Sequence, residues 1–135
     1  MSVVCIARIP ISKIDVEQHR VYGIAMTATD ASGALVIDHQ NDVITPADLE
    51  EAAYDYIRES RVGGVMHEPG ATSELITSVV LTPEVRKAMG VPEGPCAWFV
   101  GFQINDPTTW ARVKSGELSE FSIEGEATRE PYEHA

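Results

Sequence analysis

The feature that most constrains the fold is a well-marked amphipathic helix in the middle of the chain, with strand-like segments on both sides. Thr45 is a good N-cap, Pro46 suits the first helical position, and Asp48 completes a box-like start. Apolar residues then recur at the spacing of one helical face, at Leu49, Ala52, Ala53, Tyr56 and Ile57. The pattern predicts a helix over residues 46–60 with a single buried stripe.

The flanking segments show the alternation or the short apolar runs of β-strands. We predict strands over 3–9, 21–29, 64–67, 75–81, 96–104 and 118–127, and further helices that begin at Pro83 and Pro107. The 96–104 segment is the most hydrophobic and is expected to be central. The sequence therefore predicts one α+β domain over 1–135, with a small, mostly antiparallel or mixed β-sheet or barrel and about three helices. The polar tail 128–135 is expected to be mobile.

Charge and composition exclude several classes of function. The formal net charge of −11 argues against nucleic acid as a ligand, because phosphate binding needs clustered Lys and Arg. No apolar run approaches the roughly 20 residues that span a bilayer, and the N-terminus does not resemble a signal peptide, so no membrane association is expected. Cys5 and Cys96 lie in apolar strand-like segments and are predicted to be buried free thiols, as in a reducing compartment.

A serine near the C-terminus stands out as a candidate nucleophile. In the strand predicted over 118–127, Phe121, Ile123 and Ala127 share one face and are expected to meet the core. Ser122 is on the other face, with Leu118, Glu120, Glu124 and Glu126. A strand anchored by its opposite face is a rigid support for a reactive side chain. A plain solvent-facing serine gives the same pattern, and Ser119 is a weaker candidate.

One of the four histidines is the matching candidate for a general base. His67 ends the predicted 64–67 strand just before a Pro-Gly turn, at the rim of the sheet, whereas His19, His39 and His134 lie in polar segments. Imidazole titrates close enough to neutral pH to take the proton of a serine hydroxyl. A structural histidine at this position is the alternative. Many acidic residues can supply a third, orienting group, and the sequence does not choose among Glu68, Glu74, Glu124, Glu126 and Asp42.

Taken in order, these segments resemble the phage prohead (capsid maturation) serine proteases, in particular the XkdF-like branch, which is grouped with the herpesvirus assemblin fold. The resemblance covers residues 21–127. In the first half of the chain the matching segments are 21–25, the acidic loop with Asp38 and Asp42, Val43-Ile44-Thr45, the helix 46–60 and Val65-Met66-His67. In the second half they are 98–102, the helix with Trp110, Lys114-Ser115-Gly116-Glu117 and 121–125. The family often has Gly before the Phe-Ser pair, and this chain has Glu120 there.

The resemblance implies a serine endopeptidase that cleaves scaffold or major capsid precursor protein by acyl transfer, with Ser122 as nucleophile and His67 as base. It implies no cofactor and no metal, a homo-oligomer, and a location in the host cytoplasm or inside the phage procapsid. Two alternatives stay open from the residues. One is a non-catalytic virion or assembly protein that keeps the fold as a binding module, which Glu120 favours. The other is a metal-dependent hydrolase using His67 with Glu68, Asp38 or Asp42, although no metal-ligand motif occurs.

Overall fold

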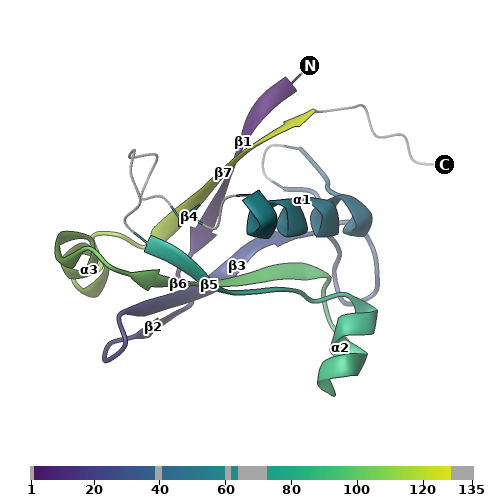
Figure 1. The fold of residues 1–135 in the computed structure, drawn as a ribbon. Helices are drawn as coiled ribbons and strands as arrows, with labels where there is room; N and C mark the ends of the chain where they lie inside the picture. The colour runs from purple at the N-terminus through teal and green to yellow at the C-terminus, as the bar shows by residue number, and fades with distance from the viewer. Residues whose placement is uncertain (1, 39–40, 60–61, 64–72, 129–135) are drawn as a thin grey trace.

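A computed structural model describes residues 2–38, 41–59, 62–63 and 73–128, with side chains for 9–38, 41–58 and 73–119. Three helices and seven strands lie in these ranges (Figure 1). In chain order they are β1 (Ser2–Pro10), β2 (Lys13–Asp15), β3 (Arg20–Thr27), α1 (Pro46–Glu59), β4 (Val62–Gly63), β5 (Ser73–Val80), α2 (Pro83–Met89), β6 (Ala97–Ile104), α3 (Pro107–Lys114) and β7 (Glu120–Thr128). None of the helices in these ranges is long and apolar enough to cross a membrane.

The strands form two antiparallel units. Five of them make a sheet in the order β2-β3-β6-β5-β4, and the remaining two, β1 and β7, pair as a ribbon. All the named pairings are antiparallel. The predicted α+β class with three helices is therefore confirmed, and so is the central place of the 96–104 segment, which is β6. The expectation for the tail falls almost entirely on 129–135, outside the described residues.

The core lies between α1 and one face of the sheet. Alternation along β6 sends Trp98, Val100 and Phe102 to this face, where each is at most 3% exposed. The Tyr56 ring of α1 meets Trp98 edge to face, with centroids 5.7 Å apart. The Trp98 indole N–H donates to the Ser78 hydroxyl of β5 at 2.9 Å, so this buried polar group is satisfied.

The helices begin and end where the capping residues predict. The Thr45 hydroxyl accepts from the Asp48 N–H, Thr82 caps α2 in the same way through the Val85 N–H, and the Asp106 carboxylate caps α3. Four members of the predicted stripe of α1 face inward, because Leu49, Ala53 and Tyr56 are buried and Ile57 is half-buried. The fifth, Ala52, is exposed, which corrects the sequence prediction.

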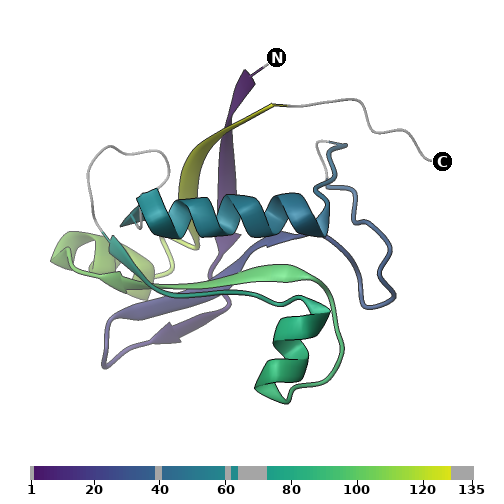
Figure 2. The same cartoon turned by 45° about the vertical axis from the view of Figure 1, so that its right-hand side comes forward.

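The β1–β7 ribbon stands steeply on the sheet, on the side where α1 lies (Figures 1 and 2). It approaches the sheet where the end of β1 passes over β3. A side chain on Gly23 would overlap the Pro10 carbonyl oxygen and would come within 2.8 Å of the Ile9 Cγ2 atom. Only glycine permits this close backbone approach. Ile9, 2% exposed, joins the ribbon to the hydrophobic core at this point.

Candidate active site

Ser122 is the third residue of β7 and lies directly opposite Arg8 of β1. The predicted strand is confirmed, but it begins later than expected, at Glu120. Leu118 therefore precedes the strand and does not belong to an exposed face shared with Ser122. It is 3% exposed and packs in the core. The side chain of Ser122 lies outside the described set, so its place is fixed by strand register alone.

The segment that leads into β7 is held tightly by the end of α3. Gly116 adopts φ +84°, which suits glycine, and its N–H donates to the Val113 carbonyl at 3.1 Å. The Leu118 N–H then donates to the Arg112 carbonyl at 2.9 Å. The Ser119 carbonyl accepts from the Ile11 N–H at 2.9 Å, next to the first ribbon pair. The candidate serine thus follows an anchored turn and a buried leucine, which together fix the start of its strand.

The predicted base, His67, lies outside the described residues, as does the whole of the 64–67 strand expected around it. The structure does describe where this segment is attached. Val62 and Gly63 form β4, which pairs with β5 so that Gly63 lies opposite Ser73. β4 also contacts β7. Gly63 and Ser73, the described residues on either side of 64–72, are therefore next to each other, and β4 brings Gly63 to the edge of the sheet that contacts β7.

The candidate acidic residues are spread over several elements. Glu74 is the second residue of β5, in register with Val62 of β4, and its carboxylate accepts from the Asn105 amide at 2.7 Å. Asp42 lies in the loop before α1, where its N–H donates to the Asp38 carboxylate at 2.9 Å. Glu124 and Glu126 occupy β7 opposite Ile6 and Val4, and Glu68 lies outside the described residues. No third catalytic group is assigned by these placements.

Metal chemistry receives no support from the described part of the chain. Within it, no group of three His, Cys, Asp or Glu side chains is placed to hold an ion. Cys96 is a buried free thiol, as predicted, and burial raises its pKa, which makes the thiolate less available. Cys5 lies in β1 opposite Gly125, and its side chain is outside the described set.

Sequence reasoning missed a role for His19, which it placed only in a polar segment. Its imidazole is exposed but stacks on the Trp110 ring, with centroids 4.3 Å apart and planes 10° from parallel. Its backbone is left-handed, with φ +57°, and its carbonyl accepts from the Ile104 N–H. His19 therefore fixes the turn between β2 and β3 against α3. A histidine in a polar connector gives no signal of this contact, because the partner is distant in sequence.

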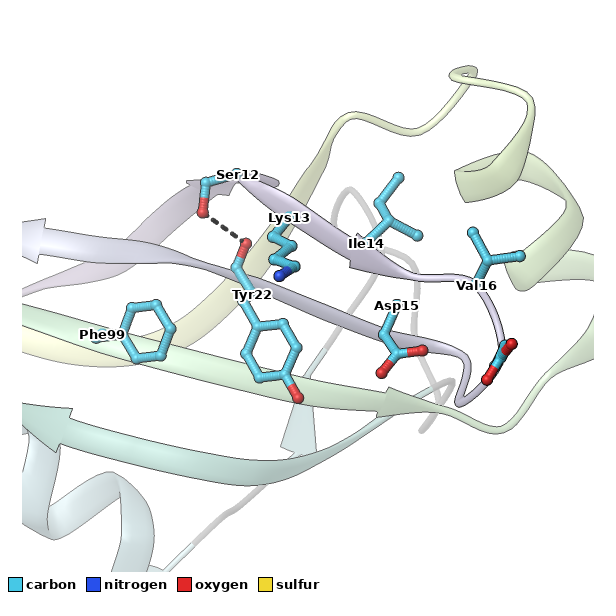
Figure 3. A pocket seen from close by; sticks show the side chains of 8 residues that line it. Ser12, Lys13, Ile14, Asp15, Val16, Tyr22 and Phe99 are labelled. Atoms are coloured by element: carbon cyan, nitrogen blue, oxygen red, sulfur yellow. Dashed lines mark hydrogen bonds between the residues drawn. The ribbon is translucent and has the colours of Figure 1, made fainter.

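A shallow hollow of about 770 Å³ lies on the face of the sheet opposite to that of Trp98, Val100 and Phe102. Figure 3 shows the side chains that line it. Tyr22 and Phe99 form its floor, with parallel rings whose centroids are 6.0 Å apart, and the Tyr22 ring lies over Gly101. Residues 12–17, which include β2, line the rest. Neither Asp42 nor Glu74, the two candidate acids whose side chains are described, lines this hollow.

These observations define a small α+β domain in which a two-stranded ribbon, packed on an antiparallel sheet, carries the candidate serine. The chain belongs to the family described as "Putative phage serine protease XkdF", which matches residues 8–131. The uncharacterized protein YqbD of Bacillus subtilis (strain 168) is 26% identical over 112 residues. That match covers 82% of this chain but only 32% of YqbD, so the chain spans about a third of this relative's length. No solved structure matches significantly, and the resemblance to the herpesvirus assemblin fold therefore stays a prediction.

Proposed function

We propose that this chain is a serine endopeptidase domain of phage capsid assembly, with Ser122 as the nucleophile and His67 as its general base. The observation that carries the proposal is the position of β7. The family match covers this strand, and Ser122 is its third residue, close to the anchored start. The chain that enters β7 is anchored by buried Leu118 and by hydrogen bonds from α3. Such a support is what a nucleophile needs to hold its attack geometry.

The attachment of the 64–72 segment supports His67 as the base. His67 follows Gly63 by four residues, and four residues reach at most about 14 Å. Since β4 contacts β7, this reach is sufficient to bring an imidazole to the serine strand. His19, the one histidine within the described ranges, is already engaged, because its imidazole stacks on the Trp110 ring of α3.

The chemistry proposed is acyl transfer. The Ser122 Oγ attacks the scissile carbonyl carbon while the His67 imidazole takes the hydroxyl proton, and the imidazolium then protonates the leaving amine. Water hydrolyses the acyl-enzyme in the second half of the reaction. The substrate proposed is scaffold or major capsid precursor protein, cleaved inside the procapsid in the host cytoplasm. The mechanism uses no cofactor and no metal.

Labelling with a fluorophosphonate, which reacts with activated serines, tests the proposal. We expect label on the wild-type chain at Ser122, located by peptide mapping, and a loss of at least about 10³-fold in labelling rate in Ser122→Ala and His67→Ala. Ser119→Ala is the matched control, because Ser119 is exposed and contributes its backbone carbonyl, which alanine keeps. It should label at the wild-type rate.

Circular dichroism of each variant separates loss of chemistry from loss of fold. Folded wild-type protein that takes no label, alone or with capsid precursor, would contradict the proposal and would favour the non-catalytic assembly module. Label that persists in folded His67→Ala would keep Ser122 as nucleophile and would remove His67 from the base role.

A further inference from the structure

The edge strand β2 carries an unusual combination of charge and apolar exposure. It pairs with β3 on one side, and no other strand in the described ranges pairs with its second side. In both views of the ribbon β2 lies at the rim of the molecule, with no element drawn beyond it (Figures 1 and 2). An edge of this kind presents backbone N–H and C=O groups that can pair with another strand.

The side chains of β2 separate cleanly by face. Lys13 and Asp15 are two residues apart and share the face of Tyr22 and the hollow, since Lys13 lies opposite Tyr22 in the sheet. Ile14 points to the other side, and so does Val16, which follows the strand (Figure 3). These two apolar side chains are 37% and 55% exposed. The edge thus places one cation and one anion on one face and exposed apolar groups on the other.

We propose that β2 is a self-pairing edge, at which a second copy of this chain adds its own β2 in antiparallel orientation about a two-fold axis at Ile14. The two five-stranded sheets then become one continuous sheet across the seam. The inference does not depend on the protease activity, because Ser122 lies in β7, which pairs with β1 and not with β2.

The charge pattern selects the occupant and the register. With Ile14 opposite Ile14 of the second copy, each Lys13 lies opposite Asp15 of the other copy, which gives two attractive pairs. A shift of two residues in one direction places the two Lys13 side chains opposite each other. A shift in the other direction does the same to the two Asp15 side chains. Both neighbouring registers therefore set one like-charge pair face to face, although the one centred on Asp15 also places Lys13 opposite Glu17. Only the central register has opposite-charge pairs and no like-charge pair.

The same register also uses the exposed apolar groups. Ile14 meets its own counterpart across the axis, and Val16 lies opposite Ser12 of the second copy. On the other face, the two hollows floored by Tyr22 and Phe99 become neighbours across the seam. Because β2 is three residues long, the pairing buries little area, and the dimer is of the weak, transient class. Its population depends on concentration, so measurement extends to millimolar protein.

Sedimentation equilibrium of charge variants tests the pairing. Lys13→Asp and Asp15→Lys each turn two attractive pairs into two repulsive ones, and we expect each to weaken dimerisation by about tenfold. The double variant Lys13→Asp/Asp15→Lys restores both pairs with their signs exchanged and should return the dimer constant to within about threefold of wild type. The double variant has the net charge of the wild type, which makes it the matched control.

The two single variants also separate pairing from long-range repulsion between acidic chains. They change the net charge in opposite directions, so repulsion alone predicts that Asp15→Lys strengthens association and Lys13→Asp weakens it. Local pairing predicts that both weaken it. Wild-type protein that stays monomeric at millimolar concentration would overturn the proposal, as would a dimer with the same constant in all four proteins.

Cross-linking is a second, independent experiment, and it locates the two-fold axis of the proposed dimer. Directly opposite residues in antiparallel strands have Cβ atoms about 4.5–5.5 Å apart, within reach of a disulfide after small adjustment or of a short bismaleimide. In a Cys5→Ser background, Ile14→Cys should form a linked dimer rapidly, since the residue faces itself. Val16→Cys, which is more exposed, should link far more slowly because it faces Ser12. Equal or reversed rates would place the axis elsewhere.

Discussion

At the scale of single residues, Gly23 decides how the ribbon meets the sheet. Pro10 ends β1 directly over β3, and the missing side chain at Gly23 makes room for its carbonyl. Nothing in the local sequence marks this glycine as different from one in a turn. Its role follows only from the crossing of two segments that are not paired with each other, and it sets the geometry of the ribbon that carries Ser122.

Gly23→Ala should therefore be strongly destabilising. The added methyl group meets backbone, which cannot rotate away, and we expect a loss of about 3 kcal/mol in the free energy of unfolding, at the upper end of overpacking effects. Urea denaturation followed by tryptophan fluorescence measures this loss. Gly94→Ala is the control, because a methyl group there meets a side-chain end instead of backbone. Displacing the Arg86 guanidinium disturbs at most its hydrogen bonds to the Pro92 and Pro95 carbonyls, so the loss should be smaller. An equal loss in both variants would contradict the backbone explanation.

At the scale of elements, α3 connects the central strand to the serine strand, and its ends are fixed by different groups. Asp106 caps its start by accepting from the Thr109 N–H at 3.0 Å and from the Thr109 hydroxyl at 2.6 Å. These two hydrogen bonds, of which the one from the Thr109 hydroxyl has the larger effect, hold the pKa of the Asp106 carboxyl below its ordinary value of 3.8. The C-terminal turn at Gly116 then directs the chain into β7.

This cap predicts a pH dependence of stability. A carboxyl group with a lowered pKa in the folded state stabilises the fold above pH 3.8, and this contribution is lost as the pH falls through the folded pKa. Asp106→Asn keeps a capping side chain and removes the titration. Between about pH 5 and about pH 2, its melting temperature should fall less steeply than that of the wild type.

Glu51→Gln provides the matched control for that experiment, since it removes one exposed acidic charge from α1. Its melting temperature should follow the wild-type curve. Parallel curves for wild type and Asp106→Asn would show that the cap does not contribute to the acid transition.

The elements themselves were largely predictable from the sequence, and the reason is local. Thr45, Thr82 and Asp106 each begin a helix through a bond to a backbone N–H three residues later, so the signal lies within one turn. β2 was missed because three residues in a polar connector have no usable periodicity. Two other features depend on contacts between segments that are distant in sequence, so a local sequence pattern cannot reveal them. They are the pairing of Arg8 in β1 with Ser122 in β7, and the exposure of Ala52.

At the scale of the whole molecule, the five-stranded sheet and the β1–β7 ribbon differ in how much of the structure packs against them. The five-stranded sheet is covered by α1 and has β6 at its centre, with strands on both sides. The ribbon has two strands, and a two-stranded unit is marginally stable unless it packs on something larger. Stability should therefore not be uniform between them.

Native-state hydrogen exchange measures this difference. The amides of Val100 and Phe102 in β6 should exchange only through global unfolding, with the full free energy of unfolding. The paired amides of β1 and β7 should exchange through a smaller opening, at a lower free energy and with a lower denaturant dependence. Identical free energies and slopes in both units would show that ribbon and sheet open together.

The pairing of β1 with β7 also has a consequence for the timing of synthesis. Among the described elements β1 is synthesised first, and its partner β7 is translated only after all the others. Contacts between such distant segments form late, because closing a long chain costs entropy before any pairing compensates for it. The sheet can assemble on the growing chain, but Ser122 reaches its strand pairing last. A nascent chain therefore acquires its candidate nucleophile only when translation of the domain is complete.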